Sequence, residues 1–251
     1  MKQGHITCKN CKNIFKGNYC NICGQDAHTG KINAHFLSHE VQHGLLHVDK
    51  GILYTIKELF TRPGYSIREF IEGKRVRHFK PLSFLLVAAG LYAFIYHFLN
   101  TGILINVKTA DSKANNAIEI LNDWIKTHYA LATLIQLPLI AYVSYLIFKK
   151  YGDNYAEQLV INTYLSGQRI IVRLALLPLF YFFPKDDFPY FYFFTDQLIP
   201  LVLFIWVYRQ YYFKERGITI VWRAALVDVL YFVLINIIVS VILTLLINMH
   251  Q

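Results

Sequence analysis

The sequence has few charged residues for its length. They make up 16% of the 251 residues, whereas hydrophobic residues make up 55%. This composition excludes a disordered chain, and it is too apolar for a water-soluble core alone. The first 30 residues contain no apolar run, which argues against a signal peptide at this end.

Acidic residues are also scarce, and the formal net charge is +9. A basic chain usually suggests a nucleic-acid partner. Here, however, 13 of the 25 Lys and Arg residues lie within residues 2–80, and the remaining two thirds of the chain is nearly neutral. We therefore relate the basic excess to membrane orientation and argue against nucleic acid as a partner.

Five stretches are long and apolar enough to cross a bilayer, which takes roughly 20 residues of helix. They are residues 81–99, 130–148, 158–183, 195–213 and 224–247. The third and fourth stretches are less uniform because they also contain charged residues. The sequence predicts an all-α integral membrane bundle of about five transmembrane helices, which forms a domain over residues 81–251.

The positions of Lys and Arg predict the orientation of these helices, because cationic loops are retained in the cytoplasm. With five spans, 19 basic residues fall on the side of the N-terminus and four on the opposite side. We therefore expect a cytoplasmic N-terminus and a C-terminus outside.

All four cysteines occur in two Cys-x-x-Cys pairs, Cys8 with Cys11 and Cys20 with Cys23. This spacing lets two thiolates bind one ion, and Gly24 permits a tight turn after the second pair. Four thiolates complete the tetrahedral coordination of Zn²⁺, so the pattern predicts one structural zinc in a ribbon over residues 1–27. Two disulfides are the alternative, which a reducing cytoplasm disfavours.

Histidines recur at every fourth residue after Asn33 and so share one helical face: His35, His39, His43 and His47. Within this stripe, His39-Glu40-Val41-Gln42-His43 matches the H-E-x-x-H motif of zinc peptidases, in which two His bind zinc and the Glu activates water. No residue stands out as a third ligand, and Gly44 weakens the helix. We favour a polar face of an interfacial helix and keep a peptidase site or a non-catalytic metal site as alternatives.

Residues 28–80 are predicted to form two or three amphipathic helices on the cytoplasmic membrane surface. Apolar residues from Ile52 to Phe60 have helical spacing, and Arg62-Pro63-Gly64 predicts a turn before a second short helix. A basic cluster precedes the first span: Lys74, Arg75, Arg77 and Lys80. Each charge near anionic headgroups contributes about 1 kcal/mol to membrane binding, so we expect these residues to contact anionic lipids.

Several short motifs carry a family resemblance. They are Tyr19-Cys20-Asn21-Ile22-Cys23-Gly24-Gln25, Asp49-Lys50-Gly51, Thr55-Ile56-Lys57-Glu58-Leu59-Phe60-Thr61-Arg62-Pro63-Gly64 and Glu72-Gly73-Lys74-Arg75, followed by Pro81. Their order resembles the domain-of-unknown-function family 3667, from Cys8 to about Leu86 and more loosely in the membrane half. The resemblance implies a bacterial multi-pass membrane protein with an N-terminal ribbon, and hence the inner membrane. It implies no reaction.

Charged residues inside the expected spans form a second candidate site. Arg169 and Arg173 lie one turn apart on the third span, and Asp228 lies in the fifth. Ionisable groups in hydrocarbon usually pair or line a water-filled path. We expect an intramembrane polar cluster of these three residues, with Glu157 and Asp196 as other candidate partners. A structural salt bridge, an anion or lipid-headgroup site, and a position at the membrane surface are the open interpretations.

These observations favour a non-enzymatic membrane scaffold or adaptor, whose ribbon and basic helices contact a cytoplasmic protein or lipid headgroups. Two alternatives stay open. One is a membrane-associated zinc metallopeptidase that uses His39, Glu40 and His43. The other is a small transporter or lipid-handling protein that uses Arg169 and Arg173.

Overall fold

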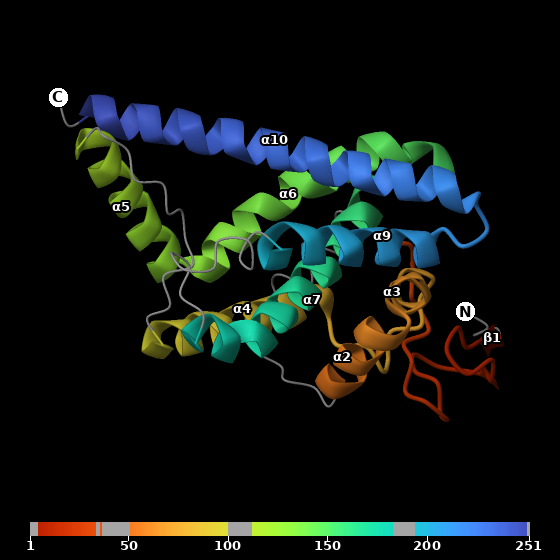
Figure 1. The fold of residues 1–251 in the computed structure, drawn as a ribbon. Helices are drawn as coiled ribbons and strands as arrows, with labels where there is room; N and C mark the ends of the chain where they lie inside the picture. Colours follow the sequence, from red (N-terminus) through yellow and green to blue (C-terminus); the bar gives the residue numbers. More distant parts are fainter. Residues whose placement is uncertain (1–4, 34–35, 37–50, 100–111, 183–193, 250–251) are drawn as a thin grey trace.

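The computed structural model describes residues 5–33, 36, 51–99, 112–182 and 194–249, and these are mainly helical (Figure 1). Two short strands come first, β1 (Ile6–Thr7) and β2 (Ile14–Phe15). The helices are α2 (Ile52–Thr61), α3 (Pro63–Ile71), α4 (Pro81–Leu99), α5 (Ser112–Thr127), α6 (Tyr129–Phe148), α7 (Tyr155–Phe182), α9 (Ile199–Tyr211) and α10 (Gly217–Met249). A 3-10 turn, η1 (Lys149–Tyr151), follows α6, and a π-helical turn, η2 (Phe194–Leu198), leads into α9.

Each of the five expected spans falls on a helix: α4, α6, α7, η2 with α9, and α10. Within the described residues, two helices are long and apolar enough to cross a membrane, Tyr129–Tyr151 and Gly217–Met249. None of the most apolar 18-residue stretch of α10 is buried in the protein. A core helix of a soluble protein hides such a surface, so α10 fits a bilayer better than water. The crossing of a membrane by these five helices stays a prediction.

The ribbon and the turns after α6 and α9 lie at one end of the bundle, which we call the ribbon end (Figure 1). Asn154 Nδ2, in the α6–α7 turn, donates to Ile32 O at 3.0 Å. Arg68 Nη1 of α3 donates to Tyr211 O, at the end of α9, at 3.0 Å. The opposite end, here called the far end, holds α5 beside the last turns of α10 (Figure 1).

Helices α2 and α3 pack into the bundle and share its core. Leu59, Phe70 and Phe79 belong to the same buried cluster as Ile161 and Phe204 of the expected spans. The basic first third of the sequence ends near residue 80, but the buried apolar cluster contains residues from both sides of that point.

The break expected at Arg62-Pro63-Gly64 is confirmed, because α2 ends at Thr61 and α3 begins at Pro63. Proline suits the first turn of a helix, where its missing N–H has no partner to lose. Gly64 allows α3 to approach α9 closely. A Cβ at this position would lie 2.3 Å from both Tyr211 N and Val207 O.

Helix α5 lies between the first two expected spans, where no long apolar stretch predicts a helix. Its apolar residues are gathered on one face, and Ala117, Ile118 and Leu121 are buried. The polar residues between them hide this pattern from a search for long apolar runs.

Candidate functional site

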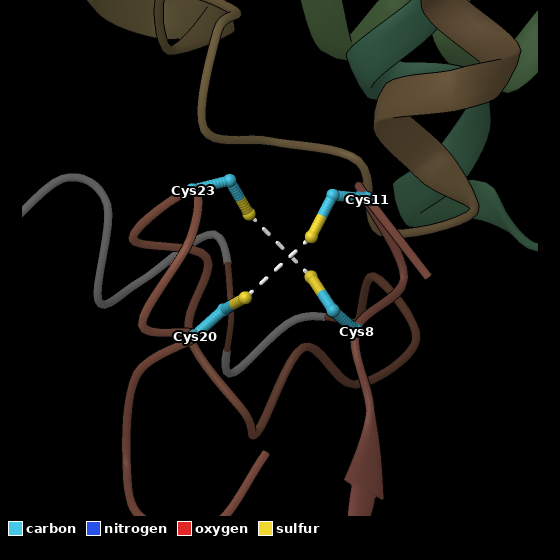
Figure 2. Close-up of side chains that lie close together, drawn as sticks. All are labelled: Cys8, Cys11, Cys20 and Cys23. Atoms are coloured by element: carbon cyan, nitrogen blue, oxygen red, sulfur yellow. Dashed lines mark hydrogen bonds between the residues drawn. The ribbon is translucent and has the colours of Figure 1, made fainter. Parts of the chain in front are cut away.

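The four cysteines converge on one point (Figure 2). All four Sγ atoms lie within 4.8 Å of one another. The Sγ atoms of Cys8 and Cys23 lie 3.5 Å apart, and so do those of Cys11 and Cys20. Each of these pairs joins one Cys-x-x-Cys motif to the other, so both motifs contribute to a single centre.

Both motifs form the same backbone turn. In the first, Cys8 N donates to Asn13 O at 2.8 Å and Lys12 N donates to Cys8 O at 3.0 Å. The second motif repeats these two bonds from Cys20 and Gly24, each at 2.8 Å. The repeated pattern explains how two short segments present four sulfur atoms to one point, above a small apolar cluster that contains the buried side chain of Phe15.

The residue after each motif has a left-handed backbone. Gly24 has a φ of 74°, which glycine adopts without steric cost. Lys12 occupies the equivalent position with a φ of 65°. Within the part of the chain that the structure describes, it is the only residue other than glycine that has a positive φ. The first turn therefore carries backbone strain that the second does not.

The protonation of the thiols differs around the cluster. Burial raises the pKa of Cys20, but the backbone N–H groups of Cys23 and Ile22 bring it down to about 6. The backbone N–H of Asn13 lowers the pKa of Cys11, whereas burial and the neighbouring thiols raise it to about 12. Four ionised thiolates repel one another at this spacing, and a divalent cation at their centre offsets that repulsion.

The donor set and its geometry fit a tetrahedral zinc ion. With Zn–S bonds of about 2.3 Å, the sulfur atoms of a tetrahedron lie about 3.8 Å apart. The observed separations of 3.5 Å and up to 4.8 Å bracket this value. Cys8, Cys11, Cys20 and Cys23 could thus hold one metal ion, and four sulfur ligands favour zinc among the common ions.

Gln25 and Arg75 fix the ribbon to the bundle. The Gln25 side chain is 3% exposed, and its Oε1 accepts hydrogen bonds from Arg75 N at 3.0 Å and Val76 N at 3.2 Å. The Arg75 guanidinium donates to Gly30 O at 2.9 Å and lies over the Phe36 ring, 4.4 Å from its centre. The segment that precedes α4 is therefore bonded directly to the metal-binding turn.

The basic cluster before α4 includes residues with partners inside the protein. Arg75 contacts the ribbon, as described above. Lys74 Nζ lies 3.0 Å from Glu69 Oε1. Burial raises the pKa of Glu69, but its contacts with Lys74 and Arg62 outweigh this effect and lower the pKa. Arg77 is exposed and Lys80 is half-buried. Lipid contact by this cluster stays a prediction, and the structure gives Arg75 a role in holding the ribbon.

The histidine stripe lies outside the described residues. His35, His39, His43 and His47 are all beyond them, as is Glu40 of the H-E-x-x-H match. The peptidase site and the non-catalytic metal site on this stripe therefore stay alternatives predicted from the sequence.

The cluster expected inside the membrane contains an ion pair between α7 and α10. Arg169 Nη2 lies 3.2 Å from Asp228 Oδ1, and the two side chains are 18% and 20% exposed. The same guanidinium group donates to Pro200 O at 3.3 Å and lies over the Phe204 ring. Of the candidate partners for Arg169, the structure selects Asp228. Glu157 instead bonds to the start of its own helix.

A cavity of about 370 Å³ adjoins this ion pair. Its polar lining includes Gln136 of α6, Arg169 and Arg173 of α7, Gln197 of η2, and Asp228, Tyr231 and Asn236 of α10. Tyr231 donates its hydroxyl to Gln136 Oε1 at 2.6 Å. The structure thus brings Arg173 and Asp228 to the same cavity, away from the ribbon end.

A hydrogen-bonded chain, which we call the Tyr208 network, lies at the ribbon end. It runs through Asp153, Tyr212, Gln158, Tyr208, Asn162 and Ser144. Asn162 Nδ2 donates to both Ser144 Oγ and Tyr208 Oη at 3.1 Å, and Tyr208 donates to Gln158 Oε1 at 2.8 Å. Burial raises the pKa of Asp153, while hydrogen bonds from Tyr212 and Tyr211 oppose this rise. Within the network, the neutral side chains of Ser144, Gln158, Asn162 and Tyr208 join α6, α7 and α9.

Sequence reasoning missed the cap of α7, although its signal is present. Asn154 Oδ1 accepts from Glu157 N at 3.0 Å, and Glu157 Oε2 accepts from Asn154 N at 2.9 Å. This reciprocal pair is a capping box, which an Asn followed three residues later by Glu can indicate. No comparable signal marks Gln136 or Tyr231, which are single polar residues within apolar segments.

The fold and the sites define a helical protein with two membrane-capable helices and a four-cysteine cluster near its N-terminus. Residues 49–93 match the model of a family described as "Protein of unknown function (DUF3667)", which confirms the resemblance over this segment. The ribbon lies outside the matched residues. No curated protein and no solved structure matches the chain.

The matched segment contains α2, α3 and most of α4, and its motif residues have structural roles. Thr55 Oγ1 accepts from Phe79 N at 2.7 Å. A Cβ at Gly51 would lie 2.8 Å from Arg77 O, so the turn before α4 passes against the start of α2. Gly73 has a φ of 108°, which favours glycine. These contacts shape the α2–α3 unit and place it against the bundle.

Proposed function

We propose that this chain is a multi-pass membrane protein that acts as a non-enzymatic scaffold or adaptor, with a structural zinc ribbon at the cytoplasmic face. The observation that carries the proposal is the closed cluster of four cysteines, fixed to the bundle through Gln25. Four thiolates leave zinc no open position for a substrate, so the metal maintains the shape of the ribbon.

The outer surface of the ribbon supports contact with a protein partner. Ile14, Tyr19 and Ile22 are 63%, 65% and 69% exposed. Apolar and aromatic side chains on a rigid support are common at the centres of protein interfaces. We expect these three side chains to contact the cytoplasmic partner.

The membrane placement is part of the proposal: five spans in a bacterial inner membrane, with the N-terminus in the cytoplasm and the C-terminus outside. Its support is the distribution of Lys and Arg and the exposed apolar surface of α10. A reporter fused after Gln251 tests it. Activity of the reporter on the outer side supports the five-span topology, and activity in the cytoplasm contradicts it.

Metal analysis of the purified full-length protein tests the ribbon. We expect one zinc per chain, and none after the combined change Cys8→Ser and Cys11→Ser. His39→Ala is the control and should retain the zinc. Zinc that persists without the two cysteines contradicts the ribbon site, and a second zinc lost with His39→Ala supports the peptidase alternative instead.

The adaptor role has its own test in cells. A photo-crosslinking residue in place of Ile22 should join the chain to one protein, and this product should disappear when Cys8 and Cys11 are replaced. Leu53, which is 76% exposed on α2, is the control position and should give no such product. Crosslinks from Ile22 to lipid alone contradict the adaptor role.

A further inference from the structure

Helix α10, which lies along one side of the bundle, carries a line of polar side chains (Figure 1). Its members recur at every fourth residue and so follow one slowly turning line along the helix: Asn236, Ser240, Thr244 and Asn248. All four are exposed. Asn236 lies near the middle of the expected span 224–247. Lipid tails offer no hydrogen bonds, so polar side chains at this depth usually face another helix or a water-filled cavity.

The helix itself satisfies these side chains only in part. Asn236 Nδ2 donates to Phe232 O at 2.7 Å, and Thr244 Oγ1 donates to Ser240 O at 2.9 Å. Within the described residues, neither Asn236 Oδ1 nor Ser240 Oγ has a hydrogen-bond partner. Asn236 also lines the cavity beside Arg169, but Ser240 and Thr244 do not, so that cavity does not account for the whole line.

The polar line forms one wall of a groove along α10. Side chains four residues apart make a ridge on a helix, and a second helix packs its own ridge into the groove beside it. One ridge consists of Phe232, Asn236, Ser240 and Thr244. The other consists of Val233, Ile237, Val241 and Leu245. A groove that one helix forms alone is therefore the surface that helix pairing requires.

The chemistry of the groove favours an identical helix as its occupant. A side-chain amide both donates and accepts, so Asn236 of one copy can bond to Asn236 of another. Copies inserted in the same orientation hold these residues at the same depth, and a two-fold axis brings the same surface of each copy together. Hydroxyl side chains as short as those of Ser240 and Thr244 let two helix backbones approach closely. Lipid tails could fill the groove but would leave its polar atoms unpaired.

We propose that the chain forms a parallel homodimer through this groove, in which the α10 helices of two copies cross near Ser240. Ridges of four-residue spacing on both helices give a crossing angle of about −50°. The dimer rests on the membrane placement proposed above and is independent of the adaptor role.

Disulfide crosslinking of the full-length protein in its membrane tests the contact. Ser240→Cys and Ile237→Cys should each give a crosslinked dimer under mild oxidation, because the two-fold axis brings the introduced thiols together. Ile242→Cys is the matched control and should give no more dimer than the unsubstituted chain, which has only the ribbon cysteines. Ile242 is also exposed but points about 200° away from Ser240 around the helix. Equal crosslinking from Ser240→Cys and Ile242→Cys, or none from either groove position, overturns the proposal.

Energy transfer between two differently labelled pools of the chain, diluted in phosphatidylcholine vesicles, measures the affinity. Asn236→Leu should weaken the dimer about tenfold, because each copy loses a hydrogen bond that lipid cannot replace. Asn236→Gln, which keeps the amide, should retain most of the affinity. The unfolding free energy of the monomer should hardly change in Asn236→Leu, since this side chain is exposed and bonds within its own helix. Unchanged affinity in Asn236→Leu, or a chain that stays monomeric at every dilution, contradicts the dimer.

The reporter at Gln251 separates this proposal from the proposed topology. If the reporter reads outside and the groove positions do not crosslink, the dimer is rejected and the five spans stand. If the reporter reads cytoplasmic and Ser240→Cys alone of the matched pair crosslinks, the five spans are rejected and the dimer stands, because a parallel contact does not depend on which side is cytoplasmic.

Discussion

The two ends of the helical bundle contain buried polar groups of different kinds. At the ribbon end, the neutral amides and hydroxyls of Gln158, Asn162 and Tyr208 bond to one another. Toward the far end, the ion pair of Arg169 and Asp228 lines a cavity. The difference indicates that neutral hydrogen bonds join the helices at the ribbon end, whereas an ion pair beside a cavity joins α7 and α10 toward the far end.

The largest effect on stability is expected at the ion pair of Arg169 and Asp228. Arg169→Gln leaves the Asp228 carboxylate without its partner, and losing one member of a buried ion pair costs about 4 kcal/mol. The double variant Arg169→Gln with Asp228→Asn should recover most of this loss, because no charge is left unpaired. Thermal unfolding in detergent measures both variants. If the double variant is as unstable as the single one, the ion pair is not what stabilises this region.

The next effect tests close packing at the ribbon end. Gly64→Ala should destabilise the protein by about 3 kcal/mol, because the new Cβ meets backbone atoms of α9 that cannot move independently. Gly90→Ala in α4 is the matched control, since a Cβ there has no neighbour within 4 Å. It should be neutral or slightly stabilising. Similar losses for both variants would show that glycine in these helices matters for another reason.

A smaller effect compares one asparagine of the network with one at the cavity. Asn162→Leu removes the donor to Ser144 and Tyr208 and should cost about 2 kcal/mol in unfolding free energy. Asn236→Leu should change stability little, because Asn236 is exposed and its side-chain amide donates within α10, to Phe232 O. A chemical denaturation series on both variants gives the difference. Equal losses would remove the contrast between the two ends.

The smallest effect is a dependence on pH at the ribbon end. Burial lowers the pKa of His78, whose Nε2 lies 2.9 Å from Ser66 Oγ. The unfolded chain takes up a proton below about pH 6.5, whereas the folded chain resists it. Stability is therefore complete above that pH and is lost as the pH falls toward the lowered value.

Melting temperatures at pH 7.5 and 5.5 measure this dependence. The difference between the two temperatures should shrink in His78→Gln and persist in His128→Gln, which changes an exposed residue between α5 and α6. An unchanged difference in His78→Gln would assign the dependence to other groups.

The sequence predicts local features well and long-range contacts poorly. The Cys-x-x-Cys spacing predicts the metal cluster because each pair is made by one short turn. Long apolar runs predict the positions of the five helices, since that signal is contained in each run. The pairing of Gln25 with Arg75 joins residues that are 50 positions apart, and that of Gln136 with Tyr231 joins residues 95 apart. No periodicity within a segment encodes such a contact.

Arg75 illustrates the limit most clearly. Its neighbours Lys74 and Arg77 make it part of a basic run, for which composition predicts a lipid contact. Its guanidinium lies over the Phe36 ring and donates to Gly30 O, because the ribbon packs against the segment before α4. Composition describes the charge of the run, and only the tertiary structure distinguishes the residue that faces the protein.

The bond between Gln25 and the segment before α4 also sets an order of events during synthesis. The ribosome makes Gln25 50 residues before Arg75, an interval of several seconds at roughly 5–20 residues per second. During this time the segment that Gln25 contacts has not yet been made, so we expect the fold of the nascent ribbon to depend on bound metal. We expect zinc uptake to precede entry of α4 into the membrane, and chains made in zinc-starved cells to begin insertion with an unfolded N-terminus.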